Sequence, residues 1–395
     1  MNWFCCACIR IRSYLRYRRA LISICGVEKP LGEIGHGKIE GDGNAVKAQS
    51  SGTQNIEAGV VGLGLMGMSI TACLLAAGHP VLAVDRSLDK LRHARRHILA
   101  LLKQMAHQRV LRRDPSKVIE NLIISESFSD MRNSQVVIES IVEDLDTKRV
   151  VLAQIEEAVS RETVIGSNTS AIPVSILQEK AKHPERILGV HWAEPAHVTR
   201  FLEIICGKRS DLRYAQRVVV LAKAWGKEPS LLRRDIRGFI TNRLMYAMFR
   251  EAFFLVENGY ANIEDVDRSL RNDLGYWITF AGPFRFMDLT GIPAYASVMK
   301  DLFPELNCDT KVPALIDQLV RSGARGVSNA HGFYPYTSKE AQRWEKLFLK
   351  FTYEIRELAQ KYPENIGNDS RHPANGRGKR KRTPRKRPPI HAIKR

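Results

Sequence analysis

The stretch VVGLGLMG, residues 60–67, decides the fold. The apolar run around Gly62 predicts a strand, and Gly64 and Gly67 follow where a helix begins. In this spacing the first glycine permits a tight turn, the second lets a phosphate approach the backbone, and the third lets helix and strand pack closely. The amide groups at the helix N-terminus favour an anion. The stretch therefore predicts a strand–turn–helix unit that binds the diphosphate of a dinucleotide.

Asp85 strengthens this interpretation. It ends the next predicted strand, PVLAVD, 23 residues after Gly62, where a carboxylate can accept hydrogen bonds from the adenosine ribose. The alternative is a glycine-rich turn without a ligand and an aspartate that caps the next helix, but context and spacing together favour the cofactor. Since a carboxylate repels a 2′-phosphate, NAD is favoured over NADP, while the neighbouring Arg86 leaves NADP open.

Strand-like and helix-like segments alternate along the first part of the chain. Predicted strands cover 58–64, 80–85, 135–141, 163–170, 186–192 and 200–206, and predicted helices cover 65–78, 88–112, 146–160 and 213–226. This alternation predicts an α/β, Rossmann-type doubly wound sheet. From Gly238 to about residue 360 the apolar period is helical. We therefore expect a flexible leader (1–54), an NAD-binding domain (55–234), an all-α domain for substrate and dimerisation (235–362) and a disordered basic tail (363–395).

The basic composition belongs to the two ends of the chain. Residues 1–27 hold five Arg and residues 371–395 hold eleven Lys or Arg, both without an acidic residue, so +16 of the net charge of +19 lies there. The composition of the tail therefore predicts a weak contact with a polyanion. The seven scattered cysteines suggest a reducing compartment, and we expect the cytoplasm. The Arg-rich start keeps the mitochondrial matrix as the alternative.

No membrane span is expected. Residues 58–84 carry no Asp, Glu, Lys or Arg, which raises the possibility of a transmembrane helix. Glycines and Pro80 divide this run into shorter pieces, so a soluble strand–turn–helix–strand unit is the better interpretation.

The stretch VHWAEPAH, residues 190–197, resembles a metal site at first sight. His191, Glu194 and His197 follow one another at intervals of three residues. Pro195 disfavours a helix here, and an extended strand would send residues three apart to opposite faces. The flanking segments RILGVHW and RFLEIIC both have strand character. If they pair antiparallel about residue 197, His191 lies opposite Glu203.

A carboxylate opposite a histidine holds one imidazole nitrogen protonated, so the other nitrogen can accept a proton. Beside a nicotinamide cofactor this arrangement can deprotonate an alcohol as its carbon loses hydride. A satisfied structural pair is the alternative. We therefore predict His191 as a general base with Glu203 as its partner, and no metal.

Six motifs occur in the order seen in the L-3-hydroxyacyl-CoA dehydrogenases, and the chain resembles that family over roughly residues 56–340. The motifs are VVGLGLMG, IVEDLDTK, SNTS, VHW with a following P and FLEI, RGFITNRL and AGPFRFMDLTG, and HGFYPYT resembles the family's Gly-Phe-Tyr ending. The resemblance implies reversible, NAD-dependent oxidation of a 3-hydroxyacyl group to the 3-ketoacyl form, in fatty acid metabolism. It also implies a helical domain that forms homodimers.

The resemblance assigns roles to individual residues. His191 matches the base and Glu203 its acidic partner. Ser170 of SNTS matches the serine that hydrogen-bonds the substrate oxygen, and Asn242 the asparagine that helps to position substrate. Glu143 and Lys148 match residues near the nicotinamide-side ribose. The structural alternatives are helix capping by Ser170, capping or bridging within its helix by Asn242, and a solvated helical pair of Glu143 with Lys148.

The chain departs from the family in two places. The family has an aromatic pair and Asn before the proline, whereas this chain has Trp192, Ala193 and Glu194. An inward carboxylate would disfavour an anionic substrate. The segment NDLGYWITFAGPF is bulkier than in the family, and its aromatic residues either reshape the acyl pocket or pack in a core. A free hydroxy acid or sugar acid, as in the gulonate dehydrogenases, is therefore the alternative substrate, and a non-catalytic scaffold that binds polyanions through its tail is the third hypothesis.

Overall fold

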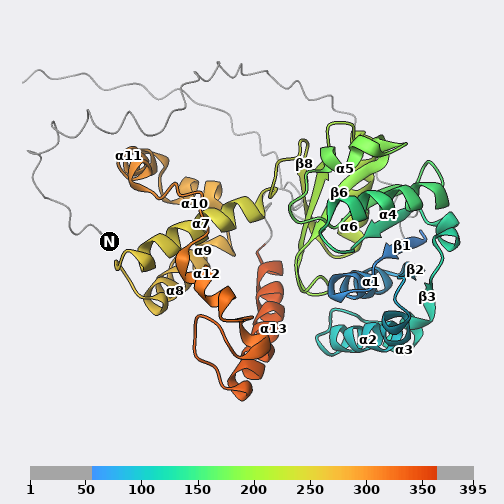
Figure 1. Ribbon diagram of the computed structural model, residues 1–395, viewed down its shortest axis with the longest axis horizontal. Helices are drawn as coiled ribbons and strands as arrows, with labels where there is room; N and C mark the ends of the chain where they lie inside the picture. The colour runs from blue at the N-terminus through green and yellow to red at the C-terminus, as the bar shows by residue number, and fades with distance from the viewer. Residues whose placement is uncertain (1–55, 363–395) are drawn as a thin grey trace, which may run out of the picture. The chain divides into compact units, whose positions relative to one another are not determined.

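A computed structural model describes residues 56–362, and Figure 1 shows their course. The predicted leader (1–54) and basic tail (363–395) lie outside these residues. Within the described range no helix is both long and apolar enough to cross a membrane.

Eight strands form one sheet in the order β3-β2-β1-β4-β5-β6-β7-β8. The strands are β1 (Ala58–Val61), β2 (Val81–Val84), β3 (Leu122–Ser125), β4 (Val136–Glu139), β5 (Val164–Ser167), β6 (Ile187–Trp192), β7 (Phe201–Cys206) and β8 (Glu228–Leu232). Neighbouring strands are parallel except β6 and β7, which are antiparallel. The predicted doubly wound sheet is confirmed, with β3 and β8 as additional edge strands.

Helices cover both faces of this sheet. They are α1 (Leu65–Ala77), α2 (Leu88–His107), α3 (Pro115–Val118), α4 (Leu145–Ala158), α5 (Val174–Leu177) and α6 (Leu212–Ala224). Short 3-10 helices lie at Ile119–Asn121, Phe128–Asn133, Gln178–Lys180, Pro184–Arg186, Phe303–Glu305 and Val327–Asn329. The prediction of a helix to residue 112 was wrong, since α2 ends at His107 and Arg109 takes a positive φ of 58°, which a continuing α-helix excludes.

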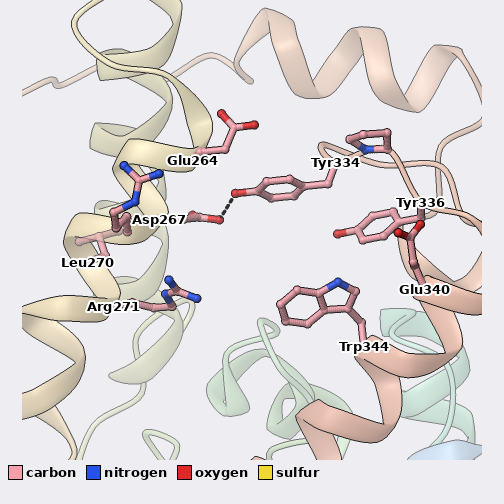
Figure 2. Close-up of a pocket in the computed structure, with 10 residues that line it drawn as sticks. Glu264, Asp267, Leu270, Arg271, Tyr334, Tyr336, Glu340 and Trp344 are labelled. Atoms are coloured by element: carbon pink, nitrogen blue, oxygen red, sulfur yellow. Dashed lines mark hydrogen bonds between the residues drawn. The ribbon is translucent and has the colours of Figure 1, made fainter.

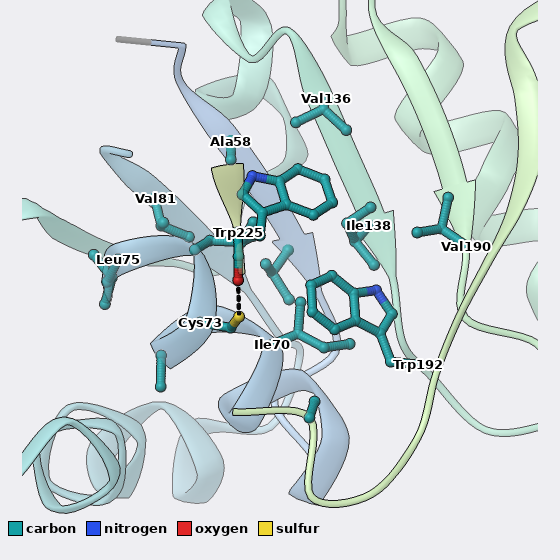
Figure 3. Packing of buried hydrophobic residues seen from close by; sticks show 14 of the residues in the cluster. Ala58, Ile70, Cys73, Leu75, Val81, Val136, Ile138, Val190, Trp192 and Trp225 are labelled. Carbon is teal, nitrogen blue, oxygen red and sulfur yellow. Dashed lines mark hydrogen bonds between the residues drawn. The ribbon is translucent and has the colours of Figure 1, made fainter. Parts of the chain in front are cut away.

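Successive side chains of the inner strands belong to two separate hydrophobic clusters, as the two-residue period of a strand requires. In β1, Val60 packs with α1, α2 and α6, while the next residue, Val61, packs with α4 and α5. Figure 3 shows the first cluster, in which Trp192 of β6 and Trp225 stack with ring centroids 5.6 Å apart. This core fixes the end of β6, and therefore the position of the residues next to Trp192.

The second part is all helical, as predicted. It contains α7 (Thr241–Glu257), α8 (Ile263–Asn272), α9 (Leu274–Ile278), α10 (Pro283–Thr290), α11 (Ile292–Leu302), α12 (Ala314–Arg321) and α13 (Ser338–Gln360). None of α7 to α12 contains a fully buried residue. A capping box of Thr337 and Glu340 begins α13. These helices lie against each other with much of their apolar surface open.

The HGFYPYT segment directly precedes α13 and is hydrogen-bonded to α8. The Tyr334 hydroxyl donates to Asp267 of α8 at 2.7 Å, and this hydrogen bond raises the pKa of the phenol to about 12. Figure 2 shows the hollow beside it, of about 700 Å³, with Arg271 of α8 on one side and Trp344 of α13 on the other. The family-like ending thus serves as a structural connection within the helical part.

Candidate active site

The glycine loop after β1 has the geometry of a phosphate cradle. Gly62 has a φ of 96°, and a Cβ atom there would lie 2.5 Å from the Ser140 carbonyl oxygen. A Cβ on Gly67 would overlap the Gly62 carbonyl oxygen, whereas a Cβ on Gly64 would meet no atom within 4 Å. Contacts within the protein therefore leave no room for a side chain at Gly62 and Gly67. The open space at Gly64 lies at the N-cap of α1, where the amide groups favour an anion.

A cavity of about 490 Å³ lies over this loop and is lined by Gly62, Gly64, Asp85, Glu143 and Ser170 among others. Asp85, at the end of β2, accepts hydrogen bonds from the amides of Leu63 (2.7 Å) and Ser87 (2.9 Å). Lys90 approaches it at 3.4 Å. These contacts hold the carboxylate at the cavity wall, so cradle and carboxylate together suit a dinucleotide.

Glu143 and Lys148 occupy different positions relative to this cavity. Glu143 lines it and accepts from the Thr169 hydroxyl (2.6 Å) and the amides of Ser170 (2.9 Å) and Ala171 (3.0 Å). Burial opposes ionisation of Glu143, but these hydrogen bonds and the nearby Lys148 lower its pKa overall. Glu143 is therefore an anchored carboxylate at the cavity wall.

Lys148 lies behind that wall with a fully buried side chain. Its Nζ is 2.6 Å from Glu139 and 3.5 Å from Glu143. Glu139 is also fully buried and accepts from the Ser167 hydroxyl at 2.5 Å. The pair of Glu143 with Lys148 is thus no solvated helical pair. Lys148 can act on a cofactor only through Glu143, which it holds in place.

His191 and Glu203 face each other across the antiparallel strands β6 and β7, in the register predicted from the sequence. His191 Nδ1 lies 3.0 Å from Glu203 Oε2. His191 is 7% exposed, with its ring edge-on to Phe201 at 5.5 Å and beside Phe239 at 5.6 Å between centroids. With Nδ1 bound to the carboxylate, Nε2 is the nitrogen available to accept a proton.

The helical part completes the environment of Glu203. Its Oε1 accepts from the backbone amides of Ile240 (3.1 Å) and Thr241 (2.9 Å), where α7 begins. Burial favours the neutral carboxyl, yet the hydrogen bonds from His191 and from the Thr241 amide outweigh it, so the pKa of Glu203 is lowered. Phe239, with a φ of 50°, is in the left-handed region, which is unfavourable for a bulky residue. This turn places the start of α7 on the carboxylate.

Ser170 and Asn242 are brought together at the same site. The Asn242 side-chain amide donates to the Ser170 carbonyl at 2.9 Å, so Asn242 bridges the two parts of the chain instead of capping its own helix. Ser170 is exposed and lines the cavity over the glycine loop. The hydroxyl of Ser170 can therefore reach a ligand in that cavity.

The remaining residues of VHWAEPAH have other roles. His197 is 5% exposed, with Nδ1 2.8 Å from the Ser69 hydroxyl and Nε2 3.3 Å from Gln104 Oε1. Burial, with a contribution from Lys227, lowers the pKa of His197 to about 4. Glu194 is exposed. Both nitrogens of His197 thus bind protein groups, which assigns it to the core.

Two supporting residues were not identified from the sequence. Asn168 accepts from the Trp192 amide at 2.9 Å and donates to the Ser140 hydroxyl at 3.2 Å, which fixes the end of β6 beside His191. Its position inside SNTS was the available signal. Phe239, against the imidazole, gave no signal beyond the preceding glycine, because its role depends on a turn that returns to β7.

The cavity over an open glycine, the carboxylate at the end of β2 and the anchored His–Glu pair define an NAD-dependent dehydrogenase. The family model of the 3-hydroxyacyl-CoA dehydrogenase NAD-binding domain matches residues 57–236. The model of the C-terminal domain of the same family matches residues 238–336. The chain belongs to the 3-hydroxyacyl-CoA dehydrogenase family.

Two curated relatives differ in activity. The chain is 28% identical over 284 residues to a 5-formyl-3-hydroxy-2-methylpyridine 4-carboxylate 5-dehydrogenase of Mesorhizobium japonicum, covering 72% of this chain and 91% of that protein. It is 32% identical over 304 residues to the fatty acid oxidation complex subunit alpha of Vibrio parahaemolyticus, covering 75% of this chain but only 42% of that protein.

Solved structures give the same two groups. A 5-formyl-3-hydroxy-2-methylpyridine 4-carboxylic acid 5-dehydrogenase, described as an NAD⁺-dependent dismutase, aligns with a TM-score of 0.72 at 25% identity over 78% of this chain and 99% of that one. The 3-hydroxybutyryl-CoA dehydrogenase of Escherichia coli aligns with a TM-score of 0.60 at 27% identity over 71% and 59%. The family is therefore clear, while its members named here act on different substrates.

Proposed function

We propose that this protein reversibly oxidises the hydroxyl group of a 3-hydroxyacyl-CoA to the 3-keto group, with NAD as the acceptor. The observation that carries the proposal is the His191–Glu203 pair, held on one side by the β6–β7 register and on the other by the start of α7. The bound NAD supplies the nicotinamide that accepts hydride.

The residues of the site transfer the proton and position the substrate. The ionised Glu203 holds the Nδ1 proton of His191, so Nε2 accepts the proton of the substrate hydroxyl. Glu203 then stabilises the imidazolium that forms. The Ser170 hydroxyl donates to the substrate oxygen, and Asn242 keeps the Ser170 backbone in place through its 2.9 Å hydrogen bond.

A free hydroxy acid is the second candidate substrate. The similarity to the pyridine-carboxylate dehydrogenase, which extends over nearly the whole of that protein, supports a substrate without CoA. The exposed carboxylate of Glu194, three residues after the base, would repel a substrate carboxylate held close to it. This repulsion is why the acyl-CoA substrate comes first.

A substrate panel distinguishes the two candidates. NADH consumption is measured with 3-ketoacyl-CoAs of several chain lengths and with free keto acids, using the wild type and His191→Gln. The proposal expects turnover of at least one acyl-CoA and a loss of turnover in the variant. Turnover of free acids alone would establish the second candidate, and full activity of His191→Gln would remove the proposed base.

We also propose a homodimer formed through the helical part. Its support is the exposed apolar surface of α13, where Trp344, Leu347, Phe348, Phe351 and Leu358 are 44–61% exposed. Their spacing places them on one face of the helix, and such a face is normally covered in solution. Phe348→Asp should shift the molar mass from dimer to monomer in light scattering, whereas Lys346→Asp, on the opposite face, should not. A wild-type monomer would contradict this proposal.

Two further proposals concern the compartment of the enzyme and the partner of its basic tail. The buried thiols of Cys73 and Cys206 and the exposed thiol of Cys308 are free, which supports a reducing compartment such as the cytoplasm. The basic tail is proposed to make a weak contact with polyanions. Salt-sensitive binding that survives deletion of residues 371–395 would contradict that contact.

A further inference from the structure

The loop of residues 193–200 connects the strand of the base to the strand of its carboxylate partner. It begins directly after Trp192 and carries the exposed Glu194. Its own hydrogen bonds are few: the amides of Val198 and Thr199 donate to the Pro195 carbonyl at 3.0 and 3.1 Å, and the Thr199 hydroxyl donates to the Ala193 carbonyl at 3.3 Å. Three further carbonyl groups, those of Ala196, Val198 and Thr199, bind side chains from outside the loop.

A buried lysine binds two of these carbonyls. Lys227 is 4% exposed, and its Nζ donates to the carbonyl oxygens of Ala196 and Thr199. The same Nζ lies 4.9 Å from the centre of the Trp192 ring, a distance at which the ring face attracts a cation. Lys227 therefore joins the middle and the last part of the loop to the Trp192 ring at the end of β6.

The third carbonyl is bound from α13. Arg356 Nη1 donates to the Val198 carbonyl oxygen at 2.5 Å. The neighbouring Tyr353, one turn earlier, is only 6% exposed, so this end of α13 is packed. Burial lowers the pKa of both Arg356 and Lys227, and the nearby Arg356 lowers that of Lys227 further. The carbonyl oxygens of the loop accept hydrogen bonds from both cations and offset this unfavourable proximity, and for Lys227 the Trp192 ring contributes as well.

Arg356 lies in a part of the chain that neither family match covers. Both family matches end by residue 336, and α13 begins at Ser338. A helix outside the matched domains thus supplies a hydrogen bond to the loop that links the base to its partner. The buried carbonyl of Val198 would lose its partner if that helix were absent, and an unpaired buried carbonyl is unfavourable.

We propose that Arg356 is a positioning residue for the substrate, acting through the loop 193–200. This inference rests on the proposed function for the identity of the substrate, but the held loop itself does not. The bound Val198 carbonyl restrains the loop, and with it Ala193 and Glu194, which follow the base by two and three residues. Without Arg356 the loop gains freedom and Glu194 moves with it, while the glycine cradle is unaffected.

The test compares Arg356→Met and Arg356→Lys with Arg343→Met, a matched change at an exposed position of the same helix. Hydrogen exchange of the peptides that cover 193–200 should become faster in Arg356→Met and remain at wild-type rates in Arg343→Met. The Kd for NADH should stay within about twofold of wild type. The kcat/KM for the hydroxy substrate should fall by about 10- to 100-fold, the effect of misplacing a substrate by about 1 Å.

A double-mutant cycle of Arg356→Met with Glu194→Gln tests whether Arg356 acts on the substrate through the loop. If Arg356 acts through the loop, the two changes affect kcat/KM non-additively. Arg356→Lys, which keeps a donor, should retain more activity than Arg356→Met, and it serves if Arg356→Met fails to fold. Unchanged exchange of the loop, or a parallel loss of NADH affinity, would overturn the proposal. Both of these measurements remain decisive even if the wild type turns over no acyl-CoA, so a wrong substrate and a wrong role for Arg356 give different results.

Discussion

The buried His197 should make the folded protein sensitive to mild acid. Both of its ring nitrogens are bound, to the Ser69 hydroxyl and to Gln104, and Gln104 Oε1 can only accept, so Nε2 carries the single proton of a neutral ring. Protonation would bring a charge into the core next to Lys227, which already opposes it together with His97. The folded state therefore resists a proton that the unfolded chain accepts readily.

The size of the effect follows from the two pKa values. The pKa of His197 is about 4 in the folded protein, against 6.5 for an ordinary histidine, and each tenfold change in proton affinity corresponds to about 1.4 kcal/mol. Between pH 6.5 and 4 the unfolded state binds the proton and the folded state does not. The contribution of His197 is thus fully present above pH 6.5 and is lost as the pH falls, by about 3 kcal/mol at pH 4.

The assay is urea unfolding of the wild type and His197→Gln at pH 7.5, 6, 5 and 4. Glutamine keeps a donor and an acceptor but has no proton to gain, so the variant should start less stable and lose less on acidification. The difference between the two free energies of unfolding should narrow by about 3 kcal/mol over this range. A constant difference from pH 7.5 to 4 would refute the neutral, buried state of His197.

Three further predictions concern the cofactor and catalytic residues. Gly64→Ala should leave the melting temperature unchanged but weaken NADH binding in a fluorescence titration, because a Cβ at residue 64 meets no protein atom. Gly67→Ala should lower the melting temperature, because a Cβ at residue 67 overlaps the Gly62 carbonyl oxygen. Glu203→Gln should lower kcat by about 100-fold or more with NADH affinity intact, and equal kcat would exclude its role. Lys148→Met should lower the free energy of unfolding by about 3–5 kcal/mol, since Glu139 would remain buried without its cation.

The sequence predicted the interior of the sheet well and its edges poorly. Strands buried on both faces, such as β1 and β4, are continuous apolar runs between turn residues, which is a strong signal. The edge strand β3 has only four residues, with Ile123 61% exposed, and β8 contains Pro229, which a sheet tolerates at its edge. Neither has a side-chain pattern that distinguishes it from a loop, because its pairing partner supplies most of its stability.

The same distinction applies to the site. Two antiparallel strands joined by a short loop have a fixed register, so the pairing of His191 with Glu203 followed from the sequence. The burial of Lys148 did not, since it depends on Glu139, which lies on a strand and not on the same helix. Nor did the hydrogen bond from Arg356, which joins residues 158 positions apart. Local periodicity carries no information on contacts of that range.

The position of Glu203 explains why one carboxylate can serve the base without becoming protonated itself. Each of its oxygens has its own donors: Oε2 has the imidazole, and Oε1 has two backbone amides at the start of α7. A proton that moved from the imidazolium to Glu203 would neutralise the carboxylate and weaken the hydrogen bonds that Oε1 accepts, and the helix N-terminus favours the negative charge. In the proposed reaction the charge therefore stays on Glu203 while His191 gains and loses its proton. Since those amides belong to the helical part, an isolated NAD-binding domain would keep the His–Glu register but lose two of the hydrogen bonds that lower the pKa of Glu203.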